Sequence, residues 1–524
     1  MAYELAIRGG MVHDGSGRTP VRADLGIAGG RIVAIGPRLG EAERDLDASG
    51  LAVAPGFIDI HSHSDYTLLV DPRAVSQVSQ GVTLEVIGNC GFGCAPVGDP
   101  RLAKDSIYGY DGSVELDWKS VGGYLDRLES VHPAVNVLTL VPNAQVRLAT
   151  MEAVDRPAAA AELERMCDLV REGLSEGAAG FSIGLEYPAE APASEDELTA
   201  LAAEAGRVGK LFATHTRDRA AGAVAAVEEV LRIGRSAEVR LQVSHLIPRC
   251  GREGSLRCVE VVDEARAAGQ DVAFDMHTRL HGTTMLSTLL PPWALKDGPA
   301  ALRRHLADPA ARERIRAYSS LILSVGDWDK VILLDIPGRS DISRKTFGEI
   351  GRALGRDPHD CALDVLSDEA EMLHRPMVLL SVYDEDLQKL AFGHALCSPA
   401  SDATALAPDG PLAGSAFHGA YTWASWFWRR VVREWKLLTP QEGVRRLTAH
   451  QARILGLHDR GSLVVGARAD VAVFDPHTFG ETATLFEPNR IAAGMRHVVV
   501  NGVPALADGV LTGSRAGQVL RMPN

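Results

Sequence analysis

The chain has 524 residues, of which 46% are hydrophobic and 23% are charged, and its formal net charge is −14. Such a length allows one large barrel with additions, or two to three domains. An acidic chain lacks the basic face that neutralises nucleic-acid phosphates or anionic lipids, so we expect neither a nucleic-acid nor a membrane partner. Seven scattered cysteines do not resemble a secreted disulfide framework. With no signal-peptide pattern and no apolar stretch near the ~20 residues of a membrane span, we expect a cytoplasmic protein with a small-molecule substrate, and a homo-oligomer stays open.

The two ends of the chain share one texture. Residues 1–56 contain short apolar runs separated by Gly-Gly and Gly-Pro turns, and the same pattern returns over 461–502. Each end is too short to bury a core alone. The pattern therefore predicts one small discontinuous β-sandwich domain built from residues 1–56 and 457–524.

Between the ends, apolar strands alternate with Ala-rich amphipathic helices such as 195–208 and 221–233. Eight such units predict an α/β fold, a TIM (β/α)8 barrel over 57–456, with catalytic groups at the carboxyl ends of its strands. Residues 287–390 separate the last two strands and predict an inserted helical lid subdomain over the barrel mouth. The predicted strands are 57–60, 82–87, 135–141, 180–183, 211–213, 241–243, 272–274 and 395–397.

The first barrel strand runs into His61 and His63. Side chains at positions i and i+2 of a strand point to one face, so these two imidazoles can converge on a single ion. Taken alone, the pair fits two ordinary histidines equally well.

Further residues with metal-binding side chains also follow strands. Cys90 lies in a Gly-rich turn after strand two, His215 and His245 end strands five and six, and Asp402 follows strand eight. A thiolate, imidazoles and a carboxylate at one end of a barrel can hold one or two divalent metals, of which zinc fits best. Each residue has a structural alternative: Cys90 as a small core hydrophobe, the histidines as core residues, and Asp402 as a helix cap. Their common position favours a metal hydrolase.

Several segments together resemble the amidohydrolase superfamily, and within it the D-aminoacylase branch of N-acyl-D-amino-acid deacylases. The resemblance covers nearly the whole chain. Most relatives bridge two metals with a carboxylated lysine at strand four, whereas this branch uses a strand-two cysteine, and 181–187 contains no lysine here. The segments that carry the resemblance are 56–63, 88–91, 180–188, 214–218, 243–245 and 467–475.

The resemblance implies a zinc-dependent amidohydrolase of non-peptide C–N bonds. It would cleave N-acyl-D-amino acids to a carboxylate and a D-amino acid by attack of metal-bound hydroxide. A tight zinc site of Cys90, His215 and His245 is implied, with a second, weaker site of His61, His63 and Asp402. Asp402 would be the general base that passes a proton to the departing amine.

Substrate contacts follow the family less closely. The lysine and arginine with which relatives grip the substrate carboxylate are missing, so Arg249 or Arg279 is a candidate replacement, unless both pair with local acids. The altered clamp keeps open another linear amide, a lactam or a cyclic imide as the substrate. A non-catalytic scaffold is disfavoured by the complete ligand set. The other predicted contacts are Tyr187, which matches the family position, and His277, Thr283 and His418.

Overall fold

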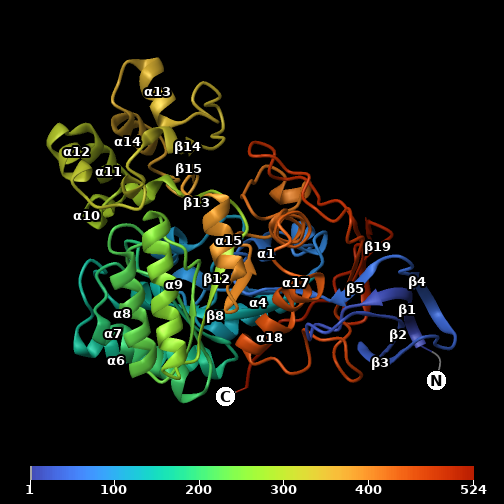
Figure 1. Cartoon of the computed structure of the whole chain (residues 1–524). Helices are drawn as coiled ribbons and strands as arrows, with labels where there is room; N and C mark the ends of the chain where they lie inside the picture. Colours follow the sequence, from blue (N-terminus) through green and yellow to red (C-terminus); the bar gives the residue numbers. More distant parts are fainter. Residues whose placement is uncertain (1–2, 524) are drawn as a thin grey trace.

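The computed structural model describes residues 3–523. Figure 1 shows a barrel surrounded by helices, an inserted segment in yellow and olive at the top left, and a sheet in blue and dark red at the right. Among the described residues, no helix combines the length and the apolar character that a membrane span requires.

The barrel consists of eight parallel strands, in the order in which they follow one another along the chain. The predicted TIM-barrel fold is thereby confirmed. It closes where Ser62 bridges Ala403, and there His63 N donates to Ala403 O over 2.8 Å. The strands are β6 (Phe57–Asp59), β7 (Val82–Ile87), β8 (Asn136–Pro142), β9 (Gly180–Gly184), β10 (Leu211–His215), β11 (Arg240–Val243), β12 (Val272–His277) and β16 (Cys397–Ala400).

Seven strands lie close to their predicted positions, but the eighth is displaced. The sequence predicts it over 395–397, whereas β16 runs from Cys397 to Ala400. Ser398 and Pro399 break the apolar pattern of this strand. A proline is tolerated here because β16 pairs with β12 on one side only, while the bridge on its other side, between Ser62 and Ala403, lies beyond the ends of β6 and β16.

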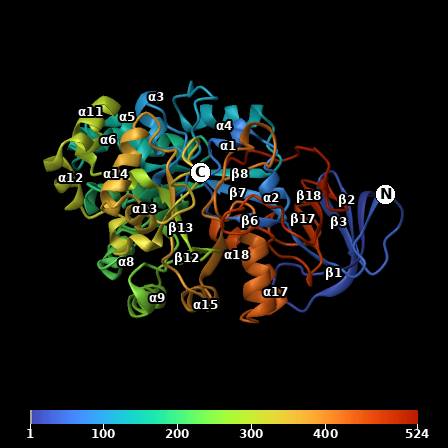
Figure 2. The ribbon, with the colours of Figure 1, turned by 90° about the horizontal axis from the view of Figure 1, so that it is seen from above.

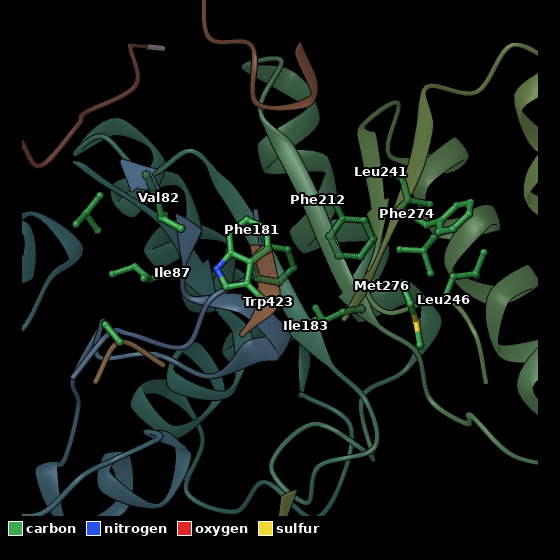
Figure 3. Packing of buried hydrophobic residues seen from close by; sticks show 14 of the residues in the cluster. Val82, Ile87, Phe181, Ile183, Phe212, Leu241, Leu246, Phe274, Met276 and Trp423 are labelled. Carbon is green, nitrogen blue, oxygen red and sulfur yellow. The ribbon is translucent and has the colours of Figure 1, made fainter. Parts of the chain in front are cut away.

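The barrel strands read as unbroken apolar runs because both of their faces are buried. On β10, Leu211 and Ala213 belong to the cluster inside the barrel, while Phe212 points outward to the helices. Figure 3 shows Phe212 between Phe181 and Phe274 in this outer layer. The helices that cover it are α4 (Val121–Ser130), α5 (Asn143–Thr150), α6 (Ala160–Ser175), α7 (Glu195–Arg207), α8 (Ala223–Ser236), α9 (Gly251–Ala267), α15 (Glu385–Gly393) and α17 (Pro440–Leu447). The short helix α18 (Ala449–Leu455) instead packs against the cluster inside the barrel.

The start of α7 contains a buried ion pair. Ser194 caps the helix by accepting from Glu197 N over 3.2 Å, but the Glu197 carboxylate does not return to close a capping box. It pairs instead with Arg147, and both side chains are buried. Arg147 also donates to the carbonyls of Ala189 and Arg156.

Replacing Arg147 by Met should lower the free energy of unfolding by about 3–5 kcal/mol, because a buried carboxylate loses its partner. Arg232→Met is the matched control, because Arg232 of α8 pairs with Glu195 at the start of α7, but both of these side chains are about half exposed. That variant should cost at most about 1 kcal/mol. Urea denaturation measures both, and equal losses would contradict this account of the buried pair.

Both chain ends contribute to one nine-stranded sheet, in which β5 pairs with β17. Seen from above, the blue and dark red strands lie together at one end of the molecule (Figure 2). Val53 and Val471 belong to an apolar core of this sheet that is distinct from the barrel core. The strands are β1 (Tyr3–Val12), β2 (Val21–Ala28), β3 (Arg31–Gly36), β4 (Ala42–Asp47), β5 (Ala52–Pro55), β17 (Val471–Phe474), β18 (Met495–Val500), β19 (Val503–Ala507) and β20 (Val510–Leu511).

The segment inserted between β12 and β16 has its own core, which includes Phe347 and Leu363. Besides the expected helices it contains a three-stranded antiparallel sheet. These strands have only three or four residues each, too few to show a period in the sequence. The elements are β13 (Gly282–Met285), α10 (Pro292–Leu295), α11 (Gly298–Ala307), α12 (Pro309–Arg316), β14 (Val331–Leu333), α13 (Phe347–Leu354), α14 (Pro358–Asp368) and β15 (Met377–Leu380).

Candidate active site

The candidate metal ligands gather at the carboxyl ends of the barrel strands. Two groups of side chains could each hold an ion, and within each group the ligand atoms lie within 4.8 Å of one another. His61 belongs to both. The first group is His61, Cys90 and His245, and the second is His61, His63 and Asp402.

Cys90 is the centre of the first group. Its Sγ lies 3.2 Å from His61 Nε2 and 3.6 Å from His245 Nε2. In the second group, Asp402 Oδ1 lies 3.2 Å from His63 Nε2 and 3.6 Å from His61 Nε2. The two groups therefore form one continuous cluster of ligand atoms.

His215 lies beside this cluster but faces elsewhere. Its ring centroid is 4.6 Å from that of His245, but its Nε2 donates to Glu186 Oε2 over 2.8 Å. The resemblance implies a ligand group of Cys90, His215 and His245. The group found in the structure differs in one member, because it contains His61 where the implied group contains His215. Glu186, in the Gly-Leu-Glu-Tyr-Pro segment, was not predicted as a site residue.

Asp275, at the end of β12, orients two of the candidate ligands. Its Oδ1 accepts from His61 Nδ1 over 3.2 Å and from His245 N over 2.7 Å. When the His61 imidazole is neutral, a proton on Nδ1 that is donated to Asp275 leaves the Nε2 lone pair directed at the cluster. Sequence reasoning did not single out Asp275, although its place at a strand end was the available signal.

Three candidate ligands have left-handed backbone conformations that L-residues rarely adopt. The φ angles are 53° at Cys90, 35° at His245 and 44° at Asp402. Such strain persists where the surrounding structure enforces it and clusters at functional sites. Gly184 supports the Cys90 turn, since a Cβ at this position would lie 2.0 Å from the Cys90 carbonyl oxygen.

Asp402 has a buried cationic partner. Arg279 Nη2 donates to Asp402 Oδ2 over 2.8 Å. Burial alone would raise the pKa of Asp402, but Arg279 and His63 outweigh it and hold that pKa well below its usual range. The remaining Arg279 donors bond to the carbonyls of His281, Ser401 and Asp402. Arg279 thus pairs with a local acid, which was the alternative to a role in binding the substrate carboxylate.

Arg249 also has a local acid as its partner. It forms an ion pair with Glu186, the carboxylate that His215 shares, and all three side chains are almost fully buried. Burial would raise the pKa of Glu186, but Arg249 and His215 lower it well below its ordinary value. Both arginines that were predicted to bind the substrate carboxylate are therefore already paired with a carboxylate of the protein.

A pocket opens beside the cluster. Among the predicted contacts, Tyr187, Arg249, His277 and Thr283 line it, together with His215, His245 and Asp402. His418 is not among the lining residues and donates through Nε2 to Leu485 O over 2.5 Å. The polar lining residues that the sequence analysis missed are Tyr108, Arg219, Thr284 and Tyr383.

The donor set suits a borderline-soft divalent metal. It combines a thiol with imidazoles, and the buried Nδ1 atoms of His63, His215 and His245 have no hydrogen-bond partner among residues 3–523. Burial raises the pKa of the Cys90 thiol, with His61 acting against it, so a cation would be needed to make Cys90 a thiolate. The residues present therefore fit a metal of the zinc type.

Comparison with known proteins points the same way. The profile of the amidohydrolase family matches residues 45–305 and 400–505. A D-aminoacylase of Alcaligenes xylosoxydans xylosoxydans is 32% identical over 99% of this chain and 97% of its own length. An N-acyl-D-glutamate deacylase of the same organism is 33% identical, with 99% and 96% covered. The crystal structure of N-acyl-D-glutamate deacylase from Bordetella bronchiseptica, complexed with zinc and a phosphonate mimic of the tetrahedral intermediate, superposes with a TM-score of 0.82 at 33% identity, over 99% of this chain and 100% of that one.

Proposed function

Because this chain belongs to the amidohydrolase family and is an enzyme of the D-aminoacylase type, we propose that it hydrolyses N-acyl-D-amino acids to a carboxylate and a D-amino acid. The resemblance read from the sequence motifs is thereby confirmed. The observation that carries the substrate proposal is full-length similarity to three deacylases of D-amino acids, of which the third acts on N-acyl-D-aspartate, at 32–33% identity.

We propose zinc as the metal, held first by Cys90 and His245, because these two belong both to the group formed by geometry and to the group implied by the resemblance. His61 and His215 flank them, and His63 with Asp402 would hold a weaker second ion. When bound, the metal would polarise the scissile carbonyl and make water a better nucleophile. Asp275 keeps His61 in the tautomer that such a site requires.

Asp402 is our candidate for the proton transfer. Arg279 occupies Oδ2, which leaves Oδ1 at the cluster to accept a proton from the attacking water and return it to the leaving nitrogen. The same ion pair keeps the carboxylate ionised before reaction. The inserted segment contributes Leu380 and Tyr383 to the pocket wall and so helps to exclude bulk water.

The proposal predicts stereoselective hydrolysis. Purified protein with zinc should release the amino acid from N-acetyl-D-amino acids with a kcat/KM at least about tenfold above that for the L-enantiomers. Cyclic imides and lactams, screened in parallel, should be poor substrates. Turnover of a cyclic imide without turnover of any N-acyl-D-amino acid would overturn the proposal.

A further inference from the structure

We propose that Arg219 binds the substrate carboxylate, and that the pocket selects N-acyl derivatives of D-amino acids with uncharged, apolar side chains. This inference rests on the proposed deacylase function and narrows its substrate class. Relatives of this chain include enzymes named for acyl-D-glutamate and acyl-D-aspartate, so the side-chain class is not given by the family.

Arg219 lies in the loop after β10 and is only 6% exposed, yet it lines the pocket. Its Nη2 donates to two backbone carbonyls, those of His245 and Ile247, and to Tyr383 OH over 3.0 Å. These neutral acceptors fix the position of the guanidinium. Its charge helps to lower the pKa of nearby Glu186, but among the described residues no carboxylate forms an ion pair with it. Within residues 3–523, no hydrogen bond uses its Nε or Nη1, so these donors stay available to a ligand.

The other two arginines of this region are already neutralised, Arg249 by Glu186 and Arg279 by Asp402. Among the described residues that line the pocket, Arg219 is thus the one cation without a carboxylate partner. A guanidinium fixed in this way is suited to a carboxylate, which it can bind through two parallel hydrogen bonds. The pocket contains the charge for one carboxylate and not for two.

The remaining lining fits an apolar side chain. Leu321, Leu380 and Val382, all from the inserted segment, contribute to the wall. A second carboxylate on the substrate would lose its hydration against this wall without gaining an unpaired cation, which is unfavourable. Thr284, 3% exposed, also lines the pocket beside Tyr108, and its hydroxyl offers a hydrogen bond to the acyl or carboxyl group.

The test compares N-acetyl-D-leucine with the neutral N-acetyl-D-leucinamide. In Arg219→Met, KM for the acid should rise roughly 10- to 100-fold with kcat little changed, while turnover of the amide stays within about threefold of the wild type. In Arg219→Lys, KM for the acid should lie between the values of the wild type and of Arg219→Met. In the wild-type enzyme, kcat/KM for N-acetyl-D-leucine should exceed that for N-acetyl-D-glutamate at least about tenfold.

Arg235→Met is the control for net charge, because Arg235 is exposed on α8, away from the pocket. If Arg219→Met does not fold, Tyr383→Phe removes the hydroxyl that orients the guanidinium and should still raise KM for the acid only. Equal losses on acid and amide, or a wild-type preference for N-acetyl-D-glutamate, would overturn the inference while the deacylase function stands. No turnover of any N-acyl-D-amino acid by the wild type would instead overturn the proposed function.

Discussion

Cys90→Ala should lose its bound metal on dialysis and, with it, at least about 100-fold in kcat/KM. Among the described residues, the two ligand groups contain a single thiol, that of Cys90. Its Sγ contacts the imidazoles of both His61 and His245. Replacing even a residue that merely orients a metal ligand typically costs 10–100-fold in affinity, so loss of a ligand itself should cost at least as much. Elemental analysis of the dialysed protein measures the metal directly.

Cys94→Ala is the matched control. Cys94 is also a buried free cysteine, and it lies only four residues further along the chain, but it belongs to neither ligand group. This variant should keep its metal and its activity. Full zinc content in Cys90→Ala, or equal loss in both variants, would contradict the assignment of Cys90. The same measurement on His61→Asn and His215→Asn shows which histidine completes the site, and we expect the larger loss for His61, whose Nε2 already faces Cys90.

The barrel could be predicted from the sequence because its strands are buried on both faces and read as short, unbroken apolar runs. Where that signal fails, the prediction fails with it. Ser398 and Pro399 interrupt the apolar pattern of β16. The strands β13, β14 and β15 are too short to show a two-residue alternation of apolar and polar residues. Their pairing depends on contacts across the inserted segment, which no local pattern encodes.

The edge of the barrel at which the candidate ligands meet was also predictable, since all of them follow strands whose carboxyl ends must coincide. The side chains that contact these ligands from other parts of the chain could not be predicted. Glu186 approaches His215 and Arg249 from a different strand end, and Asp275 joins His61 to the backbone of His245. For the same reason the sequence offered Arg249 and Arg279 as the carboxylate clamp: it shows the charge of an arginine but not whether an acid already neutralises it.

Asp402→Asn should lower kcat at least about 100-fold, the usual contribution of a general acid–base group, with much less change in substrate binding. Asparagine keeps the size of the side chain and can still accept from Arg279, but it cannot take up the proton that Oδ1 is positioned to receive. Steady-state kinetics with N-acetyl-D-leucine gives kcat, and inhibition by the product D-leucine reports on binding.

The variant also leaves the buried Arg279 without its counter-charge, so metal content and thermal stability must be measured alongside activity. Asp409→Asn serves as the control, because Asp409 is a surface acid, with its side chain 73% exposed, that pairs with Arg73. It should stay within about twofold of the wild type, since exposed ion pairs contribute little. If Asp402→Asn folds, retains its metal and still turns over at a near-normal rate, another group must transfer the proton. In that case the ion pair with Arg279 would be a structural feature of the barrel seam, where Asp402 N donates to His61 O over 2.9 Å.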